Sequence, residues 1–142
     1  MVSYFAQVEE DTIIVFFGDH QPNDSVAGPI LKAEGKNINT LSEEELLMRY
    51  EVPYVIWANY DIEEETNADT SLNYLGMKTL EVAGIKLPRY QSFLRDFEEK
   101  YPVVSTMQVR KADGTVTNVE EEEDGLLLYQ SVQYYQLFDS GE

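Results

Sequence analysis

The sequence predicts an α/β fold with a mainly parallel sheet, flanking helices and a small antiparallel hairpin. Two apolar runs, residues 12–17 and 52–58, are rich in β-branched and aromatic residues and have the length of covered strands. A helical pattern lies between them, so a right-handed crossover would make the two strands parallel. The turn signal Asp113-Gly114 separates alternating residues 107–110 from residues 115–119, and this predicts the hairpin.

Helical signals occur between and after the predicted strands. Ser42 and Glu45 have the spacing of a capping box. Either Thr70 or Ser71 can cap a later helix. The expected helices are residues 42–50, 71–83, 90–100 and 123–138. By contrast, residues 23–39 contain two glycines and a proline, and they are predicted to be a loop with at most one helical turn.

Composition predicts an ordinary folded domain spanning residues 1–142. The chain is 43% hydrophobic and 12% aromatic, which are values typical of globular proteins. The formal net charge of -17 argues against binding to nucleic acid or to an anionic membrane surface, because both would repel the chain. It is compatible with cation binding, although a solvated acidic surface explains most of it. The absence of cysteine excludes disulfides and thiolate metal sites.

The first apolar run is followed by Gly18, Asp19 and His20, and these residues define the candidate site. Ligands in open α/β sheets lie at the carboxyl ends of the strands, which is where this pair is expected. A carboxylate oxygen beside an imidazole nitrogen suits a divalent metal such as Zn²⁺ or Mn²⁺. His20 is the only histidine in the chain. The structural alternative is that Asp19 accepts hydrogen bonds from nearby backbone N–H groups and caps a turn.

Several segments resemble the C-terminal part of a lipoteichoic-acid-synthase-like sulfatase domain. That family contains phosphoglycerol transferases and belongs to the alkaline phosphatase superfamily. The resemblance covers nearly the whole chain in the right order, and Gly-Asp-His is its most specific motif. The matching segments are TIIVFFGDHQP (residues 12–22), RYEVPYVIWAN (49–59), SLNYL (71–75), EVAGI (81–85), YQ (129–130) and QYYQLFD (133–139).

The resemblance implies a partial alkaline-phosphatase-like domain in which Asp19 and His20 bind a divalent metal, with Mn²⁺ favoured over Zn²⁺ or Mg²⁺. The family's domain is longer than this chain, and its earlier half supplies a threonine nucleophile and further ligands. No catalytic nucleophile can be assigned here, so the chain alone is expected to be inactive. The expected partner is the missing N-terminal half of the domain, or a second copy of the chain. Family members are anchored by N-terminal membrane helices and act at the extracellular face of the bacterial cell membrane.

Two further residues are candidates for substrate binding. Gln21 follows the metal-ligand pair, and Asn59 ends the second predicted strand, on the same sheet edge as Asp19 if the strands are parallel. The alternative for Asn59 is a turn-forming role. Trp57 lies inside the second apolar run, so core packing is favoured over substrate stacking. The acidic runs at residues 63–65 and 120–124 lack the spacing of a calcium loop and are interpreted as solvated segments.

Three functions remain open from the sequence. The chain can be part of a metal-dependent phosphoglycerol transferase or sulfatase-type enzyme that acts on phosphodiester or sulfate ester substrates. It can be a non-catalytic remnant that pairs with another chain. The third possibility is an unrelated acidic interaction module in which Asp19 and His20 have a structural role.

Overall fold

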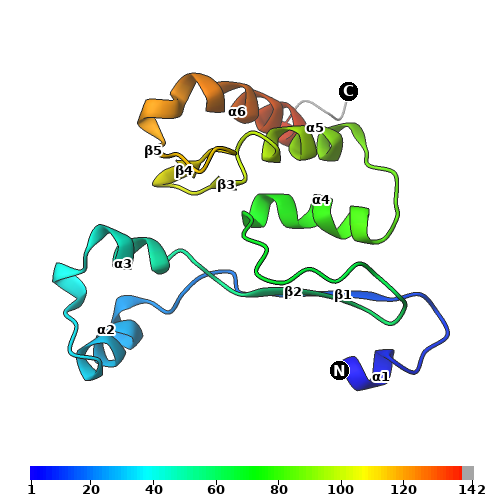
Figure 1. Cartoon of the computed structure of the whole chain (residues 1–142), viewed down its shortest axis with the longest axis horizontal. Coiled ribbons are helices and arrows are strands. Elements are labelled where there is room, and N and C mark those ends of the chain that lie inside the picture. Colours follow the sequence, from blue (N-terminus) through cyan, green and yellow to red (C-terminus); the bar gives the residue numbers. More distant parts are fainter. Residues whose placement is uncertain (139–142) are drawn as a thin grey trace. The chain divides into compact units, whose positions relative to one another are not determined.

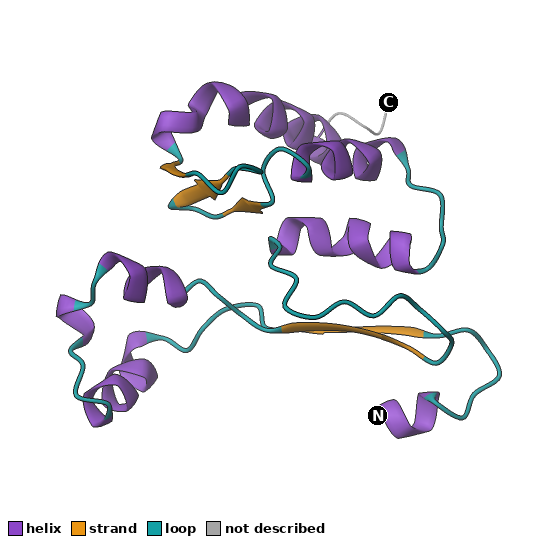
Figure 2. Ribbon diagram, in the orientation of Figure 1, coloured by secondary structure: helices purple, strands orange, loops and turns teal. Residues whose placement is uncertain are grey.

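The computed structural model describes residues 1–138, and the chain divides into two compact units, Met1–Tyr60 and Asp61–Glu142 (Figure 1). Asp139, which closes the last segment of the family resemblance, lies outside the described residues. Helices and strands occur in both units (Figure 2).

The first unit consists of a pair of strands with short helices before and between them. Figure 1 shows α2 and α3 at one end of the strand pair and α1 at the other end. The elements in chain order are α1 (Val2–Phe5), β1 (Ile13–Phe17), α2 (Asp24–Ala33), the 3₁₀ turn η1 (Ile38–Thr40), α3 (Glu43–Met48) and β2 (Tyr54–Ala58).

β1 and β2 are antiparallel neighbours, so the prediction of a mainly parallel sheet is wrong. Ile13 lies opposite Ala58, and Phe17 lies opposite Tyr54. The connection returns to the end at which β1 stops instead of crossing the sheet, and there the Gly18 N–H donates to the carbonyl oxygen of Pro53 at 3.0 Å. An apolar run predicts a strand through its composition, but the path of the connection sets the direction of that strand. No parallel pair occurs among the described residues.

The expected loop at residues 23–39 is wrong for its first half, which forms α2. Asn23 caps this helix by accepting a hydrogen bond from the Ser25 N–H at 3.0 Å, and Asp24 places a negative charge in the first turn. The local start signal outweighs Pro29, which lies inside the helix and removes one intrahelical hydrogen bond. Gly35 follows with a φ of +78°, a conformation that glycine adopts without steric cost.

The predicted capping box of α3 is confirmed. The Ser42 side chain accepts from the Glu45 N–H at 3.2 Å, and the Glu45 carboxylate accepts from the Ser42 N–H at 2.9 Å. The Ser42 N–H, followed by the ammonium of Lys36 at 3.0 Å, lowers the pKa of the Glu45 carboxyl. These contacts satisfy backbone donors that the first turn of a helix would otherwise leave unpaired.

The second unit combines three helices with a three-stranded antiparallel sheet. The predicted helices are confirmed as α4, α5 and α6, and the predicted hairpin is confirmed as β4 and β5. Gly114 has a φ of +84° in the hairpin turn, and Gly84 has a φ of +67° after α4. A third strand, β3, was not predicted. The elements are α4 (Leu72–Val82), α5 (Arg89–Glu98), β3 (Val103–Val104), β4 (Gln108–Arg110), β5 (Val116–Asn118), the 3₁₀ turn η2 (Glu120–Glu122) and α6 (Glu123–Phe138).

An aromatic core holds the second unit together. The rings of Phe97 and Tyr129 stack with centroids 5.0 Å apart, and Phe97 also contacts Tyr101 at 4.9 Å. The buried hydroxyl of Tyr74 donates to the carbonyl oxygen of Tyr101 at 2.8 Å. The core residues are Tyr74, Met77, Leu94, Phe97, Tyr101, Val109, Leu126 and Tyr129. Burial of this apolar and aromatic surface is the main stabilising contribution within the unit.

The first unit lacks a comparable core. Every fully buried residue in the described part of the chain belongs to the second unit. Phe16 of β1 is 69% exposed, and its cross-strand partner Val55 is 56% exposed. The two strands therefore present apolar side chains that the first unit itself does not cover. In the described residues, no helix has the length and apolar character needed to cross a bilayer.

Candidate metal site

The candidate site begins at a tight approach between two backbone segments at the end of β1. A Cβ atom added to Gly18 would lie 3.0 Å from the Cβ atom of Val52 and 3.3 Å from its Cγ1 atom. Only glycine fits this space without displacing its neighbour. The close approach allows the Gly18 N–H to reach Pro53, and it places the following loop beside residues 49–53.

Three side-chain contacts hold that loop in position. The amide nitrogen of Gln21 donates to the carbonyl oxygen of Glu51. Arg49 donates from one guanidinium nitrogen to the carbonyl oxygen of Pro22 at 3.0 Å and from the other to Asp24 Oδ1 at 2.7 Å. Arg49 was not predicted as a site residue, because its contacts lie 25 and 27 residues away in the sequence.

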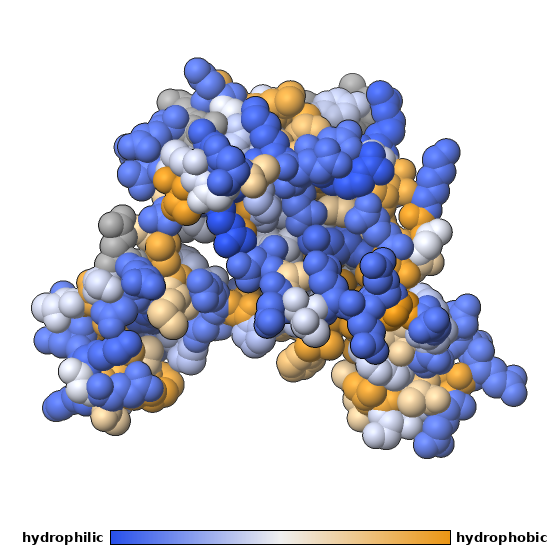
Figure 3. Space-filling view, viewed as in Figure 1, coloured by the Kyte–Doolittle hydropathy of each residue, from blue (hydrophilic) through white to orange (hydrophobic). Residues whose placement is uncertain are grey.

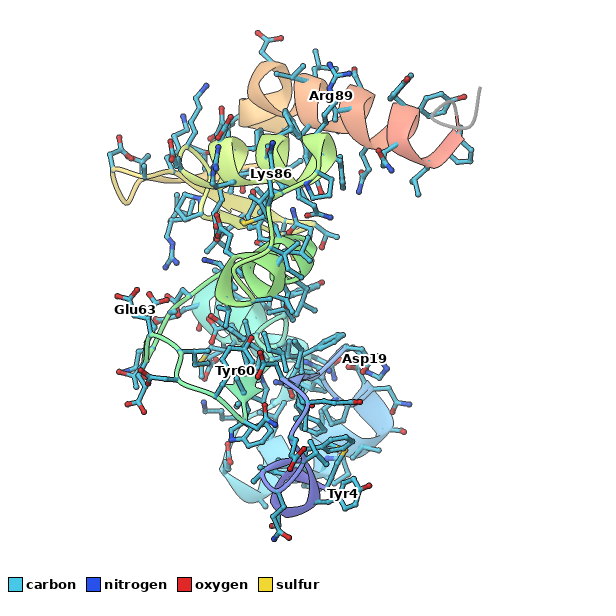
Figure 4. The ribbon with its side chains drawn as sticks, turned by 90° about the vertical axis from the view of Figure 1, so that its right-hand side faces the viewer. Tyr4, Asp19, Tyr60, Glu63, Lys86 and Arg89 are labelled. Carbon is cyan, nitrogen blue, oxygen red and sulfur yellow. The ribbon has the colours of Figure 1, made fainter. Side chains whose placement is uncertain are left out.

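Asp19 and His20 lie together on this loop with their side chains in solvent. Asp19 Oδ2 and His20 Nε2 are 3.6 Å apart, and their side chains are 80% and 76% exposed. Figure 4 labels Asp19 among the side chains of the first unit. His20 Nδ1 lies 2.9 Å from the carbonyl oxygen of Gln21. A carbonyl oxygen only accepts, so a hydrogen bond at this contact requires the Nδ1–H tautomer of the imidazole, in which Nε2 holds the lone pair.

The donor set and its spacing suit a divalent cation. Two ligand atoms that are each about 2.1 Å from a tetrahedral ion lie about 3.4 Å apart, close to the observed 3.6 Å. The pair consists of one anionic oxygen and one imidazole nitrogen, which are ligands of Mn²⁺ and Zn²⁺. However, no group of three or more histidine, aspartate or glutamate residues that could hold a metal occurs in the described part of the chain.

Asn59 lies at the other end of the strand pair from Asp19 and His20. The reason is the antiparallel register, because Asn59 N–H donates to the carbonyl oxygen of Thr12, before β1, at 3.1 Å. Its side chain binds backbone groups: Oδ1 accepts from the Thr12 N–H at 2.7 Å, and Nδ2 lies within 3.2 Å of the carbonyl oxygens of Phe5, Val8 and Glu10. The expectation that Asn59 shares a sheet edge with Asp19 is therefore wrong.

The remaining candidates have the following environments. Gln21 adjoins the pair, but its amide group contacts the backbone of Glu51. Trp57 is partly buried within β2. The acidic residues 63–65 lie exposed in a loop, where Figure 4 labels Glu63, and residues 120–122 form η2 just before α6.

Comparison of the chain with family models, curated proteins and solved structures found no match.

Proposed function

We propose that this chain is the C-terminal part of a metal-dependent phosphoglycerol transferase or sulfatase-type domain, to which it contributes Asp19 and His20 as metal ligands. The observation that carries the proposal is the arrangement of His20. Its Nδ1–H is directed to the carbonyl oxygen of Gln21, and its Nε2 lone pair lies 3.6 Å from a carboxylate oxygen of Asp19. Histidines that bind a metal through one ring nitrogen commonly donate the N–H of the other nitrogen to a carbonyl or carboxylate oxygen.

The class of substrate follows from the sequence resemblance, which implies phosphodiester or sulfate ester chemistry. A bound divalent metal would neutralise charge on the transferred group and lower the pKa of a hydroxyl nucleophile. Within this chain, Asp19 provides an anionic oxygen and His20 a neutral nitrogen. The resemblance favours Mn²⁺ over Zn²⁺ or Mg²⁺ as the metal. The nucleophile belongs to the earlier half of the parent domain, which would be positioned on the extracellular face of the bacterial membrane by its N-terminal anchor.

The exposure of the strand pair supports an incomplete domain. A two-stranded sheet is marginally stable alone, and both faces of β1 and β2 consist of apolar residues. Figure 3 shows hydrophobic residues at the surface among hydrophilic ones. The earlier half of the domain, or a second copy of this chain, would cover these strands. Unpaired strand edges favour such association, whereas the net charge of -17 opposes it between copies.

One observation favours the alternative that the chain is a non-catalytic remnant or an acidic interaction module. The pair supplies two ligands only, and a stable zinc site usually has at least three from the protein. In that case Asp19 and His20 would remain a solvent-exposed pair, and the apolar strands would serve association alone.

Calorimetric titration with Mn²⁺ tests the proposal. We expect weak binding that His20→Ala and Asp19→Ala both abolish. Glu63→Ala is the matched acidic control, because it removes one exposed charge far along the sequence from the pair. Equal loss in Glu63→Ala and Asp19→Ala would mean diffuse counterion binding. Tight binding that survives His20→Ala would contradict the proposal.

A further inference from the structure

We propose that Arg49 is a positioning residue for the metal pair, and that it acts by fixing the peptide unit that selects the tautomer of His20. The inference rests on the proposed function, since it concerns the same pair. Arg49 follows the last residue of α3, and its side chain is 23% exposed. Its hydrogen bonds to Pro22 and Asp24 reach the segment that follows β1.

The guanidinium of Arg49 holds two acceptors in a fork. One guanidinium nitrogen donates to the Pro22 carbonyl oxygen at 3.0 Å, and the other donates to Asp24 Oδ1 at 2.7 Å. A planar guanidinium fixes two acceptors at once in a defined relative orientation, which a lysine ammonium does not do. The two acceptors flank Asn23, the cap of α2, so Arg49 joins the loop to the start of that helix.

Pro22 extends this restraint to Gln21. The ring of Pro22 fixes its own φ, and a residue that precedes proline is restricted to extended conformations. With the Pro22 carbonyl held by Arg49, the preceding Gln21 carbonyl has little freedom to rotate. The Gln21 side chain, which donates to the carbonyl oxygen of Glu51, restrains the same residue from its other side.

The Gln21 carbonyl in turn determines which nitrogen of His20 is available to bind a metal. This carbonyl accepts from His20 Nδ1 at 2.9 Å. A neutral imidazole has one protonated nitrogen, so this hydrogen bond leaves Nε2 unprotonated beside the Asp19 carboxylate. The other tautomer would direct an N–H at Asp19, and no lone pair would be available for a cation between the two residues.

Nitrogen NMR of the metal-free chain tests the inference directly, because His20 is the only histidine. In the wild-type chain with a neutral ring, we expect the ¹⁵N signals of a protonated Nδ1 and an unprotonated Nε2. In Arg49→Met, the two signals should move towards each other as both tautomers become populated. Arg49→Lys, which keeps the charge without the fork, should resemble Arg49→Met. Arg95→Met is the matched control, because Arg95 pairs with Asp96 in α5.

Mn²⁺ titration, followed by broadening of the His20 ring signals, gives the second readout. Arg49→Met should weaken binding about tenfold, the lower end of the effect of removing an outer-shell partner. Trp57 emission reports whether the first unit remains folded, since Trp57 is the only tryptophan. If Arg49→Met unfolds that unit, then Arg49→Lys, which keeps the charge without the fork, decides by the same signals.

The failures of the two proposals are distinguishable. Wild-type ¹⁵N signals and wild-type Mn²⁺ affinity in a folded Arg49→Met or Arg49→Lys chain would overturn the positioning role while leaving Asp19 and His20 as ligands. Mn²⁺ binding that survives His20→Ala would overturn the proposed function, and with it the use of the selected tautomer. A shift of the tautomer signals in Arg49→Met but not in Arg95→Met would support the positioning role.

Discussion

Replacement of Asn59 by alanine should destabilise the first unit by about 1.5–4.5 kcal/mol. Its amide group connects the end of β2 to the segment before β1 through the Thr12 N–H and three carbonyl oxygens. Two amide hydrogens serve those three carbonyls, so about three hydrogen bonds are lost in total. Each hydrogen bond contributes about 0.5–1.5 kcal/mol net, which gives the expected range. Asn59→Asp should be at least as harmful, because a carboxylate would face the same carbonyl oxygens.

Urea unfolding followed by Trp57 fluorescence measures this effect in the unit that contains Asn59. The control is Asn39→Ala, because Asn39 is exposed in η1 of the same unit. We expect the midpoint of Asn59→Ala to fall with an unchanged denaturant slope, and cleavage by a protease before residue 12 to become faster. A loss below about 0.5 kcal/mol, or one equal to that of Asn39→Ala, would refute this reasoning.

Four further outcomes are expected. Gly18→Ala should lower the free energy of unfolding in urea by roughly 1–3 kcal/mol, because the added Cβ would lie 3.0 Å from Val52. Gly28→Ala should raise it by about 0.5–1 kcal/mol, because Gly28 lies inside α2 with open space around its Cβ position. Burial raises the pKa of the Tyr74 phenol above its ordinary value. The contribution of the neutral phenol to the free energy of unfolding is therefore complete below about pH 10 and declines as the pH rises further. In urea titrations, the stability of Tyr74→Phe should decline less at alkaline pH than that of the wild-type chain. The chain alone should not turn over a generic phosphodiester or sulfate ester with Mn²⁺, and turnover that Asp19→Ala abolishes would contradict this. Sedimentation should show association that strengthens with salt, whereas a monomer at every salt concentration would argue against it.

Signals that depend on neighbouring residues predicted the local structure well. The capping box of Ser42 and Glu45, the glycine after α4 and the Asp113-Gly114 turn each involve contacts within a few residues, and each is confirmed. The start of α2 was also readable from Asn23 and Asp24, but Gly28 and Pro29 were given too much weight. The short helix α1 has no side-chain cap, and the sequence held no signal for it.

Long-range arrangement could not be predicted in the same way. The direction of β2 relative to β1 depends on pairing between Ile13 and Ala58, and nothing in either apolar run encodes that choice. The error in direction moved Asn59 to the wrong end of the strands. Asp19 and His20 were placed together correctly because they are adjacent in the chain. Arg49 was missed because a single arginine has no local pattern that reveals a contact with Pro22.

The connection between the two strands is a long segment, residues 18–53. Hydrogen bonds between Gly18 and Pro53 and between Arg49 and Pro22 hold its two ends together. For a flexible loop, each doubling of length adds only about 0.6 kcal/mol to the closure cost. Extra residues at the exposed turn around Gly35 would therefore leave the register of Ile13 with Ala58 unchanged. This turn should therefore tolerate insertions. A tag or small domain inserted there should not disturb the Asp19–His20 loop.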